Sequence, residues 1–194
     1  MVRDAKREGR RIAMLTAYDA TFARIVDDAG VDVILVGDSV ATVVQGEATT
    51  IPVTLEEMEY HVRMVARART RALVVGDLPF GTYQSGPARA VDSAARLVKA
   101  GAAAVKLEGG VHVADCVLAL TRMDVPVMGH VGLTPQSYHR MGGHRVQGRR
   151  EGRDAGANEL VHAAHLVGRR LRGQDFADHR AHFLGEVGAR TVEV

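Results

Sequence analysis

The chain has 194 residues, 46% of them hydrophobic, which is enough for one domain with a buried core. Its 25 basic and 23 acidic residues give a formal charge of +2, so charge does not indicate nucleic acid or an anionic membrane as a partner, and a small molecule is expected instead. Cys116 is the only cysteine, which excludes an intrachain disulfide and favours a reducing cytoplasm.

The N-terminal stretch MVRDAKREGRR is charged, and only the short apolar stretch IAMLT follows it. A signal peptide needs an apolar core of roughly 7–15 residues, and a membrane span needs about 20. We therefore expect a protein that is neither exported nor embedded in a membrane.

Short apolar runs alternate along the chain with longer segments of helical periodicity. The apolar runs predict strands at 11–16, 32–37, 72–76, 102–107 and 125–130. The periodic segments predict helices at 18–30, 53–68, 87–100 and 112–122. In the first helix Phe22, Ile25, Val26 and Ala29 fall at helical spacing, and at the second Thr54 with Glu57 resembles a capping box. Repeated strand-then-helix units with continuous apolar strands predict an α/β fold with parallel strands covered by helices.

Polar side chains stand where four of these strands end: Asp38 with Ser39, Asp77, Lys106 with Glu108, and His130. In a TIM (β/α)8 barrel the chemistry gathers at the C-terminal ends of the strands, so this pattern favours a barrel over an open doubly wound sheet. A full barrel takes about 250 residues. Five strands are complete by residue 130 of 194, which predicts an incomplete barrel with about five βα units.

The segment after Arg149 has a different composition, with eight arginines, four histidines and no lysine from that residue onward. We therefore expect barrel units over 1–149 and an atypical, partly helical tail over 150–194 that is not a separate domain. A helix is predicted between Asn158 and Gly173, because Leu160, Ala164, Val167 and Leu171 form an apolar stripe. The histidine pairs His162/His165 and His179/His182 are interpreted as solvated rather than metal-binding, because no cysteine or zinc-protease pattern accompanies them.

Asp38 and Asp77 follow neighbouring apolar runs, VILVG and ALVVG. Two carboxylates from adjacent strand ends are ligands that Mg²⁺ prefers, and Glu108 could add a third, directly or through water. The alternative is that both aspartates only begin turns, as aspartate often does. Spacing alone does not separate these interpretations.

Lys106 has three interpretations beside these carboxylates. It forms a structural ion pair, or it stabilises an anion that develops on a substrate, or it forms a Schiff base as in an aldolase. The nearby carboxylates favour the charged amine and so oppose the third role. No GxGxxG turn and no GxxxxGK[ST] loop is present, so dinucleotide-binding and P-loop functions lack support.

Five stretches in this order closely resemble the ketopantoate hydroxymethyltransferase (3-methyl-2-oxobutanoate hydroxymethyltransferase) family: TAYDATFARIVDDAGVDVILVGDS, TIPVTLEEMEYH, DLPFGTYQ, VKLEGG and PVMGHVGLTPQS. The resemblance runs from about Arg11 to Arg149. It implies a TIM-barrel enzyme of pantothenate (coenzyme A precursor) biosynthesis that forms a homo-oligomer, a decamer in bacterial members.

The resemblance also implies a reaction and its cofactors. The family transfers a hydroxymethyl group from 5,10-methylenetetrahydrofolate to 3-methyl-2-oxobutanoate, giving 2-dehydropantoate, through an enolate stabilised by Mg²⁺. Matching motifs assign Asp38, Asp77 and Glu108 to the metal, and Asp38, Ser39, Asp77 and Lys106 to the 2-oxo acid. His130, in GHVGLTPQ, lies near the site in such enzymes.

The sequence departs from the family pattern at the expected sixth strand. The family's general base is a glutamate in a context like LVLE, and no acidic residue after His130 follows such a strand. Glu193, in TVEV, has the nearest context but is not assigned the role. The family pattern stops near GGHRVQGR, and our hypothesis is that a frameshift or premature end replaced the family's C-terminal third.

Three functional hypotheses therefore stay open: a Mg²⁺-dependent hydroxymethyltransferase, a catalytically inactive remnant of that enzyme, and a Schiff-base aldolase using Lys106. A five-strand sheet would also leave unpaired edges, which predicts instability, aggregation and loss of the family's oligomer.

Overall fold

The structure is a computed structural model that describes residues 2–143. Five parallel strands form one sheet in the order β1-β2-β3-β4-β5. Their bounds are β1 Met14–Thr16, β2 Val33–Val36, β3 Leu73–Asp77, β4 Ala104–Glu108 and β5 Val127–His130. Each strand lies beside the next one in the sequence, as in a barrel, whereas a doubly wound sheet reverses its order at a switch point. The α/β class and the parallel sheet are thus confirmed.

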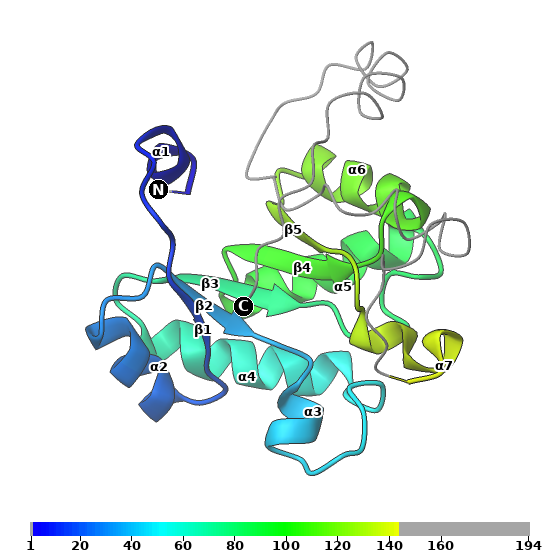
Figure 1. Ribbon diagram of the computed structural model, residues 1–194, viewed down its shortest axis with the longest axis horizontal. Helices are drawn as coiled ribbons and strands as arrows, with labels where there is room; N and C mark the ends of the chain where they lie inside the picture. The colour runs from blue at the N-terminus through cyan, green and yellow to red at the C-terminus, as the bar shows by residue number, and fades with distance from the viewer. Residues whose placement is uncertain (1, 144–194) are drawn as a thin grey trace.

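Helices connect the strands, and four of them, α2, α4, α5 and α6, pack along one face of the sheet (Figure 1). The helices are α1 Val2–Arg7, α2 Ala20–Asp28, α3 Val40–Val43, α4 Leu55–Ala68, α5 Pro87–Ala100, α6 Ala114–Arg122 and α7 Tyr138–Met141, with 3-10 turns η1 Val111–Val113 and η2 Pro135–Ser137. The short α3 and α7 follow β2 and β5, so they lie in the loops after the strand ends.

The strand side chains alternate between two apolar clusters, because successive residues of a strand point to opposite faces. The larger cluster lies between sheet and helices and includes Ile34, Val74 and Val105. The smaller one, on the other face, is built on Val33, Val75, Ala104 and their partly buried neighbours Leu35, Leu73 and Met128. The same alternation places Asp77, Lys106, Glu108 and His130 on the second face, at the C-terminal ends of their strands.

The capping box predicted at Thr54 and Glu57 is confirmed. Thr54 and Glu57 form a reciprocal capping box at the start of α4. The helix expected at 87–100 is α5 with the same bounds, and Gly101 ends it in a left-handed conformation with φ of 116°. A side chain there would be strained and would bring a Cβ within 2.5 Å of Ala66 Cβ on α4.

The N-terminal expectations need two corrections. The strand expected at 11–16 is only Met14–Thr16. The helix expected at 18–30 is Ala20–Asp28, because the Asp19 carboxylate caps it by accepting from the backbone N–H groups of Thr21 and Phe22.

The apolar spacing of α2 also does not mark its buried face. Phe22 and Ile25 are 60% and 56% exposed, while Ala23, Val26 and Asp27 are buried. Helical periodicity identified the helix but not which side faces the sheet.

The predicted helix after Asn158, the two histidine pairs and Glu193 lie outside the described residues. Within the described part of the chain, no helix is long and apolar enough to cross a membrane.

Candidate active site

The ends of β2 and β3 bring two buried aspartates together. The Asp38 backbone N–H donates to Asp77 Oδ2 at 3.1 Å, and the two residues are only 4% and 1% exposed. Strand β4 adds Lys106, which pairs with Asp77 in the sheet register and forms an ion pair with Asp77 Oδ1. The sequence-predicted meeting of Asp38, Asp77 and Lys106 is therefore observed.

Burial and mutual repulsion govern the charges of this group. Burial, together with the charge of Asp77, raises the pKa of Asp38 to about 6, although a hydrogen bond from Gln136 and the charge of Lys106 act in the opposite direction. Burial also raises the pKa of Asp77, against the lowering effect of Lys106. Burial alone would lower the pKa of Lys106, but Asp77 and its neighbours raise it. Lys106 is thus held as an ammonium.

Glu108, at the end of β4, is bonded to the protein through both carboxylate oxygens. His130 Nδ1 lies 2.9 Å from Oε1, and the Gln136 backbone N–H donates to Oε2 at 2.9 Å. His130 stands opposite Glu108 in the β4–β5 register, which explains their contact. The structure therefore places His130 beside Glu108, at the edge of the group.

Ser39, the residue after Asp38, contacts the side chain of Tyr18. Its Oγ lies 2.7 Å from the Tyr18 hydroxyl, and the Tyr18 carbonyl lies 2.7 Å from His61 Nδ1 on α4. This chain of contacts links the loop after β1 to the end of β2.

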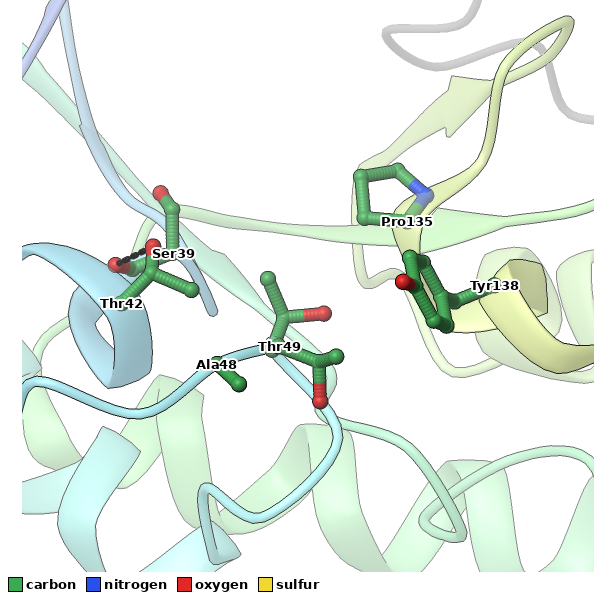
Figure 2. Close-up of a pocket in the computed structure, with 7 residues that line it drawn as sticks. Ser39, Thr42, Ala48, Thr49, Pro135 and Tyr138 are labelled. Atoms are coloured by element: carbon green, nitrogen blue, oxygen red, sulfur yellow. Dashed lines mark hydrogen bonds between the residues drawn. The ribbon is translucent and has the colours of Figure 1, made fainter. Parts of the chain in front are cut away.

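A cavity of about 360 Å³ opens beside this group. In Figure 2, Ser39, Thr42, Ala48 and Thr49 form one wall, and Pro135 and Tyr138 face them from the loop after β5. Apolar walls with a few hydroxyl groups are typical of small-molecule sites. Ser39 follows Asp38 and Pro135 precedes Gln136 in the sequence, so the cavity lies near the carboxylate group, but its walls do not include the charged side chains.

The carboxylates of this site are oxygen donors of the kind that hold hard cations. Among residues 2–143, no group of three or more His, Cys, Asp and Glu side chains is arranged to hold one. Asp38 and Asp77 nevertheless fit Mg²⁺, which uses one or two protein carboxylates and fills its other positions with substrate and water. With Glu108, the buried group contains three carboxylates and one ammonium, that of Lys106. A divalent cation would balance the excess of carboxylates.

Sequence reasoning missed Gln136 and Tyr83. Both are buried, and the Tyr83 hydroxyl lies 2.8 Å from Gln136 Oε1. Neither follows a strand directly, so the rule that site residues stand at strand ends does not find them. Their position inside DLPFGTYQ and PVMGHVGLTPQS, two of the stretches that resemble the family, could have indicated them as site residues.

The sequence profile of the family described as ketopantoate hydroxymethyltransferase matches residues 1–169. The chain belongs to this family. The match continues past Arg149, where the resemblance was expected to end.

Similar proteins in this family are named 3-methyl-2-oxobutanoate hydroxymethyltransferase. The one from Trichlorobacter lovleyi is 53% identical over 163 residues, which is 84% of this chain and 60% of that protein. The one from Geotalea daltonii is 57% identical over 149 residues, 76% of this chain and 56% of that protein. The chain thus spans between half and two thirds of the length of these relatives.

Solved structures support the fold alone. A phosphonopyruvate hydrolase in complex with oxalate and Mg²⁺ aligns with a TM-score of 0.55 at 16% identity, over 66% of this chain and 50% of that one. A 2,3-dimethylmalate lyase of the PEP mutase/isocitrate lyase superfamily aligns with a TM-score of 0.51 at 22% identity, over 66% and 49%. The neighbours are of the TIM-barrel type, in agreement with the sequential strand order.

Proposed function

We propose that this chain serves hydroxymethyl transfer from 5,10-methylenetetrahydrofolate to 3-methyl-2-oxobutanoate, giving 2-dehydropantoate for pantothenate synthesis. In this proposal the described residues form the part of the site that binds Mg²⁺ and the 2-oxo acid. The observation that carries it is the buried Lys106–Asp77 ion pair beside Asp38 at three adjacent strand ends. Membership of the family supports it.

Asp38 and Asp77 would hold the metal, and Glu108 would be a further ligand, directly or through water. Bound Mg²⁺ supplies Lewis-acid stabilisation of the negative charge that develops on the keto oxygen. Asp38 and Asp77 are buried, so they are held in place before a ligand arrives.

Lys106 and Ser39 would bind the 2-oxo acid. Removal of the C3 proton moves negative charge toward the keto oxygen, and a fixed ammonium nearby stabilises that charge more in the transition state than in the ground state. The Ser39 hydroxyl, oriented by Tyr18, offers a hydrogen bond to a substrate oxygen. We expect the folate to approach through the adjoining cavity, and we assign no general base among residues 2–143.

A Schiff-base role for Lys106 is disfavoured. Such a lysine must lose its proton to attack a carbonyl, which requires a lowered pKa. The Asp77 carboxylate instead raises the pKa of Lys106 and pairs with its ammonium. Borohydride in the presence of a 2-oxo acid should therefore trap no adduct.

Calorimetry with 3-methyl-2-oxobutanoate tests the proposal. We expect binding that requires Mg²⁺ and is lost in Asp77→Asn, with Asp124→Asn as a control in a turn outside the site. Binding that ignores Mg²⁺ and survives in Asp77→Asn would refute it. Deuterium exchange at C3 with Mg²⁺ but without folate then separates the two remaining hypotheses, because an active chain exchanges the proton and an inactive remnant only binds.

A further inference from the structure

The side chain of Gln136 occupies the centre of the polar group at the C-terminal edge of the sheet. It lies in η2, after β5, and is only 6% exposed. Its Nε2 donates to Asp38 Oδ2 at 2.8 Å and to the Leu78 carbonyl at 3.0 Å. Its Oε1 accepts from the Tyr83 hydroxyl at 2.8 Å and from Gln84 Nε2 at 2.9 Å. All four hydrogen-bonding positions of the amide are used.

This bonding fixes the orientation of the amide. Asp38 Oδ2 and the Leu78 carbonyl only accept hydrogen bonds, so a flipped amide would set its oxygen against two other oxygens. A buried polar group that loses its partner costs about 1–3 kcal/mol. Gln136 therefore presents its donors to Asp38 in one geometry only.

The backbone of Gln136 reaches a second carboxylate. Its N–H donates to Glu108 Oε2 at 2.9 Å. The residue thus connects Asp38 after β2, Leu78 after β3 and Glu108 at the end of β4 from a position after β5. The side chain and the backbone N–H of Gln136 thus connect the ends of β2, β3, β4 and β5.

We infer that Gln136 is a positioning residue that sets the orientation of the Asp38 and Glu108 carboxylates for ligand binding. The inference rests on the proposed function, since it assumes that Asp38 binds the metal. With Oδ2 held by Gln136, the carboxylate cannot rotate freely, and Oδ1 is turned in a fixed direction. Residues that orient metal ligands in this way typically change metal affinity by about 10–100-fold when they are replaced.

The test is calorimetric titration of the full chain with Mg²⁺ alone, together with thermal unfolding. Gln136→Met keeps the length of the side chain and removes its side-chain hydrogen bonds, while the backbone N–H to Glu108 stays, so the variant tests the orientation of Asp38. We expect Mg²⁺ affinity to fall about 10–100-fold. Gln84→Met is the matched control, because it removes one bond to the same Gln136 oxygen but touches neither carboxylate. It should lower thermal stability while Mg²⁺ affinity stays within twofold of the wild type.

A second variant keeps the test decisive if Gln136→Met does not fold. Gln136→Asn keeps a neutral amide but is one methylene shorter, so its donors no longer reach Asp38 Oδ2 and the Leu78 carbonyl in the same geometry. It adds no charge to the site, so weaker Mg²⁺ binding in this variant points to lost orientation. Unchanged or tighter binding in Gln136→Asn would overturn the inference while leaving the proposed function standing. Absence of Mg²⁺ binding by the wild-type chain would overturn both.

Discussion

The sequence left three roles open for Lys106, and two of them are compatible: a structural ion pair, which is observed, and stabilisation of a substrate anion, which we propose. Lys106 forms a buried ion pair with Asp77, and it also brings a fixed positive charge to the edge where a substrate anion would bind. The exposed fractions of the two side chains, 13% and 2%, leave little water to screen the pair. The contact balances the buried charge of Asp77, and we propose that the same ammonium binds the substrate.

A double-mutant cycle measures this pair. Lys106→Met and Asp77→Asn should each lower the free energy of unfolding by about 3–5 kcal/mol, because each leaves a buried group without its partner. The double variant should lose clearly less than the sum, since no unpaired charge remains. Urea denaturation provides the values. The exposed Arg7–Asp4 pair is the control, and Arg7→Ala should change stability by less than about 1 kcal/mol. Additive losses at Lys106 and Asp77 would show that the two residues do not interact.

At the scale of elements, Asp27 joins α2 to the start of β3. Its carboxylate accepts from the backbone N–H groups of Thr70, Arg71 and Ala72 and from the Thr70 hydroxyl. Burial acts to raise the pKa of Asp27, but these hydrogen bonds outweigh it and hold the pKa far below its ordinary value. These hydrogen bonds thus connect the buried side of α2 to the segment that leads into β3.

The lowered pKa predicts a specific pH dependence. A carboxylate whose pKa is lower in the folded state adds stability above its unfolded pKa of about 3.9, and loses it as the pH falls toward the folded value. Asp27→Asn should therefore cost about 2–3 kcal/mol at pH 7, and less at pH 3. Denaturant unfolding at pH 7, 5 and 3 gives the difference. Asp28→Asn, at an exposed neighbouring position, should change little. A cost for Asp27→Asn that is equal at all three values would contradict the assignment.

At the scale of the molecule, apolar side chains are exposed beside β1, which pairs only with β2 among the described strands. Leu15 on β1 is 52% exposed and Phe22 on α2 is 60% exposed. Met14 on β1, Ile25 on α2 and Ile12, just before β1, are exposed as well. An edge strand with exposed apolar side chains is a template for pairing with another chain. We therefore predict that self-association, which the sequence also predicted, occurs through the β1 edge.

Charged substitutions at this edge should reduce self-association. We expect Leu15→Lys with Phe22→Lys to lower the light-scattering signal at equal protein concentration, with little change in melting temperature, because both side chains are already exposed. Val98→Lys with Met123→Lys is the matched control, since it adds the same two charges at exposed positions on α5 and at the end of α6, away from the β1 edge. Equal reduction by the control would point to net charge rather than to the β1 edge.

The sequence by itself determined the order of the five strands and of the four longer helices, the capping box at Thr54, the bounds of α5, and the arrival of Asp38, Asp77, Lys106 and Glu108 at strand ends. These features depend on local signals: apolar runs, caps, glycine, and the two-residue period of a strand. The sequence did not predict the short helices α1, α3 and α7. Only the tertiary structure decided that Phe22 and Ile25 face outward while Asp27 faces inward, and that Gln136 joins the two carboxylates. Those outcomes depend on contacts between residues 28 to 98 positions apart, such as Gln136 with Glu108 and with Asp38, and no spacing rule along one strand or helix encodes such contacts.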